Sequence, residues 1–149
     1  MAESSVVKKL QVKPGQKIAF IQPPPGYVAG LGQLPPGTEM IENPGVPVDV
    51  VQLFVKDSQE LEKLVPSAIR AVKHDSLLWV SYPKGTSKVK TDLNRDRLWQ
   101  AMEKHGFAGV SLISIDNTWS AMRFRPKEKV GEIIESVYRL RSPPYQVLS

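Results

Sequence analysis

The sequence predicts a three-layer α/β domain, built on a mostly parallel β-sheet that closes with a C-terminal antiparallel hairpin. Three observations support this fold class. Apolar runs at 48–55 and 77–80 are typical of strands buried on both faces. The amphipathic stretch between them has the length of a crossover helix, so the two strands should be parallel. Near residue 117, two further strands are joined so closely that they must be antiparallel.

Length and composition indicate one domain spanning 1–149. A chain of 149 residues with 41% hydrophobic residues can bury roughly two-thirds of the surface that its unfolded form exposes. Within this domain we expect residues 1–12 to form an N-terminal arm and residues 126–149 to form a terminal helix and tail.

Cysteine content and hydropathy bear on location and chemistry. The chain has no cysteine, which excludes disulfides, thiolate metal sites and a cysteine nucleophile, and fits a reducing compartment. It has neither a secretory leader pattern nor an apolar run of the roughly 20 residues needed to cross a bilayer. We therefore expect a cytoplasmic protein. The net charge of +5 is a modest excess, typical of a solvated surface and weak support for nucleic-acid binding.

The first third of the chain begins with a short strand at 17–21. Three consecutive prolines, Pro23 to Pro25, then stand where a nucleotide-binding fold would turn on glycines into a helix. Because proline has no backbone N–H, this turn lacks three donors that could hold a phosphate. A weak helix at 27–34 and an edge strand at 38–42 follow.

The central part should form a strand, helix and strand. Asp57 and Glu60 have the spacing of a helix capping box, and an apolar stripe continues from Leu61 to Val72. Pro66 lies inside that stripe and should kink or split the helix. His74 and His105 are each expected near a helix C-terminus, and neither has a partner at metal-ligand spacing.

The last third should contain a helix at 94–104 and a strand at 110–115. A tight turn at 116–117 leads to the return strand at 118–125. A terminal amphipathic helix at 130–138 and a proline-containing tail at 142–145 complete the predicted elements.

Several motifs carry a resemblance to known families. The closing order of helix, parallel strand and antiparallel return resembles the C-terminal half of class I S-adenosylmethionine-dependent methyltransferases, which have a Rossmann-like fold. At residue level the chain is similar to a family of small bacterial proteins of unknown function. The motifs that match are Lys13-Pro14-Gly15, Asp49-Val50-Val51 with Leu53-Phe54-Val55, Leu78-Trp79-Val80-Ser81-Tyr82-Pro83-Lys84, Thr91-Asp92-Leu93, and Asp116-Asn117-Thr118-Trp119-Ser120 with Arg123-Phe124.

The resemblance implies a fold but no established activity. The glycine turn of the methyltransferases is replaced by Pro-Pro-Pro-Gly at 23–26, and no acidic residue ends a second strand to hold ribose hydroxyls. We therefore predict that the chain uses no such cofactor, and no metal.

The most promising site is the loop that follows the strand at 77–80. From Lys84 to Arg97 it has five basic residues against two acidic ones, and it leads into a helix N-terminus at the expected carboxyl edge of the sheet. The loop is either an anion site or a solvated basic loop. The candidate ligand-binding residues are Tyr82, Lys84, Lys88, Lys90, Asp92, Arg95, Asp116 and Trp119.

Asp116 and Trp119 also have a structural interpretation, which the sequence favours. Asp and Asn are ordinary turn residues, and Trp119 could close the core beside a hairpin turn. No residue is identified as catalytic.

Three functions follow from these patterns. The first is a non-catalytic, methyltransferase-like module that binds a small anionic ligand or a protein partner. The alternative is a small enzyme acting on a phosphorylated or carboxylated metabolite at the edge formed by Lys84 and Asp116. A second alternative is a weak nucleic-acid binder. A homodimer is a further expectation, since symmetric dimers are common.

Overall fold

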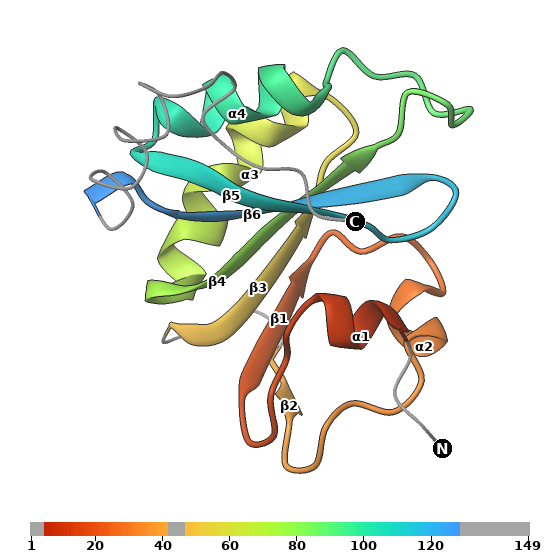
Figure 1. Cartoon of the computed structure of the whole chain (residues 1–149), viewed down its shortest axis with the longest axis vertical. Helices are drawn as coiled ribbons and strands as arrows, with labels where there is room; N and C mark the ends of the chain where they lie inside the picture. Colours follow the sequence, from red (N-terminus) through yellow and green to blue (C-terminus); the bar gives the residue numbers. More distant parts are fainter. Residues whose placement is uncertain (1–4, 42–46, 129–149) are drawn as a thin grey trace.

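The computed structural model describes residues 5–41 and 47–128 (Figure 1). In chain order the elements are α1 (Ser5–Lys9), β1 (Lys17–Ile21), α2 (Tyr27–Gly30), β2 (Glu39–Met40), β3 (Val48–Phe54), α3 (Ser58–Ala71), β4 (Val72–Pro83), α4 (Arg95–Glu103), β5 (Phe107–Ser114) and β6 (Trp119–Pro126). The predicted helix at 130–138 and the tail lie outside the described residues. Among the described helices, none combines the length and apolar character needed to cross a bilayer.

One six-stranded sheet organises the fold, in the order β2-β1-β3-β4-β6-β5. The strands β2, β1, β3 and β4 are parallel to one another, and β6 runs antiparallel between β4 and β5. This arrangement confirms the predicted fold class. The chain leaves β1 towards β2 on one side and leaves β3 towards β4 on the other, so the strand order reverses between β1 and β3. In open α/β sheets, ligands bind beyond the carboxyl ends of the strands at this reversal.

The sheet is covered on both faces. On one face α3 and α4 pack through Leu61, Val65 and Leu98 against the central strands. The opposite face, beside α1 and α2 in Figure 1, has a second core that includes Val7 and Trp79. Strand β3 contributes Val51 and Leu53 to the first core and Val50 to the second, so both of its faces are buried and most of its positions are apolar.

Asp57 is the N-cap of helix α3, as its spacing to Glu60 predicts, but the Glu60 carboxylate binds the residue before the N-cap and not the N-cap itself. Asp57 accepts a hydrogen bond from the Glu60 N–H at 2.8 Å, and the Glu60 carboxylate accepts one from the Lys56 N–H at 2.6 Å. The helix continues through Pro66 as one element, so the predicted split is wrong. Proline removes a single backbone hydrogen bond there, and buried residues on both sides of it hold the helix to the sheet.

Residues 5–12, expected as an arm, pack on the sheet as α1 and the segment after it. Val7, Leu10 and Val12 are buried there. The indole Nε1 of buried Trp79 donates a hydrogen bond to the Leu10 carbonyl at 3.1 Å. The sequence did not predict α1, because a five-residue helix is too short to show a periodic pattern.

An irregularity in β4 changes the position expected for His74. Val72 pairs with Val48 and Leu77 pairs with Val50, so β4 contains three more residues than β3 over this interval, and Asp75 adopts a left-handed φ of 57°. His74 therefore lies in a strand and not at the helix end, with its Nε2 3.3 Å from the Glu128 carboxylate. His105 does follow α4, as predicted, with its Nε2 3.2 Å from the Glu62 carboxylate.

Candidate functional site

The point of strand reversal, where β1 and β3 end, is filled by side chains of the chain itself. Tyr27 of α2 packs edge-on against Phe54, the last residue of β3, with ring centroids 4.7 Å apart. Trp119 packs edge-on against the same Phe54 at 5.2 Å. Phe54 is only 1% exposed, so these aromatic rings close the space beyond β3.

A polar chain lies beneath these rings. The Tyr27 hydroxyl donates to the Gln52 side-chain oxygen at 2.8 Å, and the Gln52 amide donates to the Ser81 hydroxyl at 2.9 Å. Gln52 and Ser81 are fully buried in adjacent parallel strands, so these bonds satisfy groups that water cannot reach. Burial raises the pKa of the Tyr27 hydroxyl to about 12, and the Asp116 carboxylate adds a smaller upward shift. Gln52 is a polar residue within an apolar run, and it was the one feature of the sequence that could have indicated these buried hydrogen bonds.

The turn at 22–26, which contains the three prolines, also helps to close the space beyond the ends of β1 and β3. Gln22, between β1 and the prolines, has a left-handed φ of 59°, and its side-chain amide donates to the Phe54 carbonyl at 3.1 Å. Gly26 then adopts a φ of 79° and leads directly into α2, which carries Tyr27. The turn therefore directs an aromatic side chain towards the end of β3.

Lys84 and Asp116 meet at the β5–β6 turn, but in structural roles. The Lys84 ammonium donates to the Ser114 hydroxyl at 2.6 Å, and the Lys84 N–H donates to the Thr118 carbonyl at 2.7 Å. Asp116 accepts hydrogen bonds from the N–H groups of Thr118 and Trp119, each at 2.8 Å. These contacts match the turn interpretation of Asp116, and they attach the start of the basic loop to the hairpin.

Lys90 and Asp92 lie apart from that turn, in an open hollow of about 490 Å³ beside the start of α3. Asp92 accepts from the Ser58 N–H at 2.8 Å and from the Ser58 hydroxyl. A carboxylate of the chain thus takes the position at a helix N-terminus where an external anion could otherwise bind.

Asp92 should contribute to acid sensitivity. Hydrogen bonds from the Ser58 side chain and backbone hold the pKa of Asp92 below its usual value. A lowered folded-state pKa stabilises the fold above the unfolded pKa, and this stabilisation is lost as the pH falls from the ordinary aspartate value of 3.8 through the lower folded value. Asp92→Asn should therefore flatten the pH dependence of the melting midpoint in this range. Ser58→Ala should act in the same direction. An unchanged profile in both variants would contradict this role.

The remaining candidates do not join one site. Tyr82 is buried in β4 on the face covered by α3 and α4, and burial raises the pKa of its hydroxyl, while nearby Arg95 opposes that rise. Lys88 and Arg95 are exposed. The structure therefore separates the eight residues into the hairpin turn, the hollow beside α3, the neighbouring pair of Tyr82 and Arg95, and the exposed Lys88.

Comparison with solved structures shows the fold. A ribosomal protein L11 methylase from Lactobacillus delbrueckii subsp. bulgaricus matches with a TM-score of 0.54 at 12% identity, over 81% of this chain and 74% of the methylase. A Haemonchus contortus phosphoethanolamine N-methyltransferase, solved with S-adenosylhomocysteine, matches with a TM-score of 0.54 at 14% identity, over 84% of this chain and 39% of that enzyme. A Streptococcus agalactiae protein of the NADB-Rossmann superfamily matches with a TM-score of 0.50 at 10% identity, over 94% and 86% of the two chains.

No protein-family model matches the chain, and no curated protein matches it in sequence. The solved structures confirm, at the level of the fold, the likeness to methyltransferases that the closing elements predicted. The motif resemblance to the small bacterial family stays a prediction.

The residues at the strand reversal do not fit the cofactor that this fold carries in methyltransferases. Tyr27, Phe54 and Trp119 pack against one another there, and the turn after β1 contains three prolines without N–H donors. We therefore derive no reaction step from S-adenosylmethionine.

Proposed function

We propose that this chain is a non-catalytic module with a methyltransferase-like fold, which binds a small anionic ligand through the basic loop that follows β4. The non-catalytic role rests on one observation, the aromatic side chains that pack together beyond the ends of β1 and β3. A reaction needs a substrate or cofactor against the reacting groups, and the place where this fold presents them is occupied by Tyr27 and Phe54.

The basic loop supports the second half. Lys88 and Lys90 are exposed, and Lys84 is partly exposed while its backbone is held by the hairpin. Of these, Lys90 lines the open hollow beside α3 together with the carboxylates of Asp57 and Asp92, so the support comes from the exposed lysines and not from the hollow itself. A protein partner with an acidic surface would use the same charges. The enzyme alternative has less support, because Lys84 and Asp116 are both engaged in the hairpin turn.

A melting experiment tests the absence of a cofactor site. S-adenosylmethionine at about 1 mM should leave the midpoint of the wild-type protein unchanged, because Tyr27, Phe54 and Trp119 pack against one another at the strand reversal. A ligand present at about 100 times its Kd would add about 2.7 kcal/mol to the free energy of unfolding. A clear rise with S-adenosylmethionine would overturn the non-catalytic proposal.

The anion half has its own test. Inorganic pyrophosphate at low ionic strength should raise the midpoint of the wild-type protein, and the double variant Lys84→Gln with Lys90→Gln should lose this rise. Glu39→Gln, on the exposed edge strand β2, is the control that should keep it. No rise in the wild-type protein would remove the small-ligand role. Binding of mixed oligonucleotides with a steep salt dependence would instead indicate the nucleic-acid alternative.

A further inference from the structure

A second polar hollow lies at the opposite end of the sheet, where β1, β3 and β4 begin. Its volume is about 380 Å³, and its polar lining includes Gln11, Lys13, Gln16, Asp49, Asp75 and Arg123. We call it the amino-edge hollow. The residues come from the segment after α1, the turn before β1, the starts of β3 and β4, and the middle of β6. No motif in the sequence joins them.

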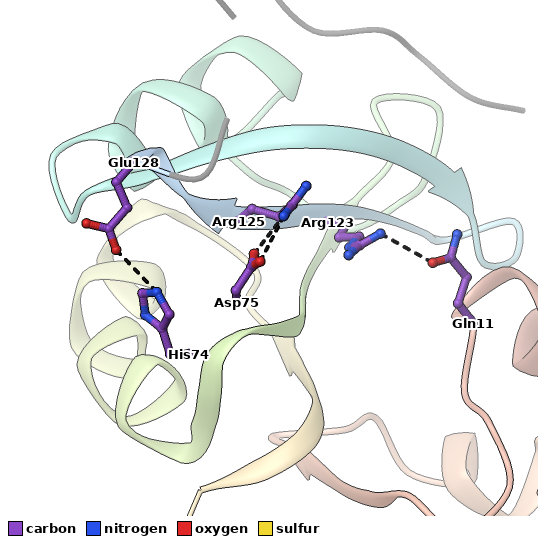
Figure 2. Close-up of polar contacts among 6 residues, drawn as sticks. All are labelled: Gln11, His74, Asp75, Arg123, Arg125 and Glu128. Carbon is purple, nitrogen blue, oxygen red and sulfur yellow. Dashed lines mark hydrogen bonds and ion pairs between the residues drawn. The ribbon is translucent and has the colours of Figure 1, made fainter. Parts of the chain in front are cut away.

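Arg123 is the partly buried cation of this hollow, and few acceptors of the described residues offset its charge. In β6 it pairs with Trp79, on the sheet face that α1 covers in part. Its Nη1 donates to the Gln11 side-chain oxygen at a long 3.3 Å (Figure 2). Its Nε is inaccessible to water and has no acceptor among the described residues. A guanidinium is always charged, so this enclosed N–H without an acceptor leaves Arg123 poorly compensated, and an anion in the hollow would bind to its Nη groups.

The carboxylates of the hollow are already paired with cations. Asp75 accepts two hydrogen bonds at 2.8 Å from Arg125, in the bidentate arrangement that Figure 2 shows. Asp49 accepts one bond from the Lys73 ammonium and one from the Lys17 N–H, both at 2.9 Å. Asp75 also attracts Arg123, but its hydrogen bonds go to Arg125, and none of the described carboxylates hydrogen-bonds to Arg123, which can therefore bind an external anion.

Two further donors lie within reach of such a charge. The ammonium of Lys13 is exposed and forms no ion pair with any residue that the structure describes. The Gln16 side-chain oxygen accepts from the Lys13 N–H at 2.9 Å, which leaves its amide nitrogen as a donor.

Backbone strain gathers at the same place. Gln11 and Asp75 have φ values of 64° and 57°, and they are two of the three described non-glycine residues with positive φ. Such conformations cost energy and persist where the surroundings impose them, often at binding sites. Here they place one side chain on each side of Arg123 (Figure 2).

We propose that the amino-edge hollow binds an oxyanion, the phosphate or carboxylate group of a small polar metabolite, with Arg123 as its principal ligand and Lys13 as a second cation. A planar guanidinium binds such groups through two parallel hydrogen bonds. Burial and the neighbouring Arg125 lower the pKa of Arg123, Asp75 partly opposes them, and a bound anion would oppose them further. This site lies at the opposite sheet edge from Lys84 and does not depend on the function proposed above.

Calorimetric titration of the full chain tests the proposal, with inorganic phosphate and succinate as separate probes at low ionic strength. At least one probe should bind saturably with a Kd of about 1 mM or tighter. The probe that binds more tightly identifies the group as a phosphate or a carboxylate. Arg123→Gln should weaken that binding at least tenfold, and Lys13→Gln should weaken it by a smaller factor.

The control variants separate this site from the basic loop. Lys84→Gln with Lys90→Gln removes any anion binding by the basic loop, so the binding that remains in this double variant is that of the amino-edge hollow and should still be weakened by Arg123→Gln. Circular dichroism and a cooperative melt verify that Arg123→Gln is folded, and Arg123→Lys serves in its place if it is not. Absence of saturable binding in the wild-type protein, or an unchanged Kd in the Arg123 and Lys13 variants, would overturn the proposal.

Discussion

Trp79→Ala is expected to lower the free energy of unfolding by about 3–5 kcal/mol. Trp79 is fully buried in β4, in the core that α1 and α2 cover. It lies opposite Gln52 of β3 and Arg123 of β6 in the strand register, so the truncation leaves a cavity at the centre of the sheet. It also removes the donor that binds the Leu10 carbonyl. Urea denaturation of the two proteins measures the difference.

Trp79→Phe is the matched comparison. It keeps an aromatic ring in the core, so it should cost less than the alanine variant. The lost indole N–H leaves the Leu10 carbonyl without its donor, a further loss of about 1–3 kcal/mol. The phenylalanine variant should also expose the segment after α1 to protease before global unfolding. Equal stability of the alanine variant and the wild-type protein would contradict this packing.

Gly109→Ala should be the most damaging change of a single methyl group. A Cβ added at Gly109 would lie 2.5 Å from Trp99 Cδ1 and 2.7 Å from the Met122 sulfur. Both neighbours are buried, and the Trp99 ring is rigid, so the methyl group forces β5 away from α4. Overpacking of this kind costs about 1–3 kcal/mol, and occasionally more.

Gly85→Ala is the control for Gly109→Ala. Nothing lies within 4 Å of a Cβ added at Gly85, and this residue is not among the glycines with positive φ. The control should therefore be neutral, or stabilising by about 0.4–1 kcal/mol through the unfolded chain. Equal melting midpoints for the two alanine variants would show that β5 and α4 are packed less tightly than the structure has them.

Local patterns predicted most of the elements correctly. The strand at 17–21 has the bounds expected for it, and the strand at 48–55 ends one residue earlier than expected. The N-cap at Asp57 and the antiparallel return after the turn at 116–117 are also confirmed. These features depend on neighbours within a few positions, or on periodicities of two and 3.6 residues, which a sequence displays directly.

The candidate site depends on contacts that neighbouring residues in the sequence do not reveal. The basic loop has the charge that the sequence indicates, but its acidic member Asp92 binds Ser58, 34 positions away, and Asp116 serves its own turn. Charge and spacing alone could not distinguish a carboxylate that awaits a ligand from one that already caps a helix.

Local sequence patterns were enough to predict the α/β class, the order of the central elements, and the lack of a glycine-rich phosphate turn. Only the tertiary structure decided that Tyr27 and Phe54 close the crevice, and that Arg123 lies beside Gln11, 112 positions distant. The physical reason is that strand pairing brings remote residues together. Which donors then find acceptors depends on register and on single irregularities such as the one at Asp75, which carry no periodic pattern.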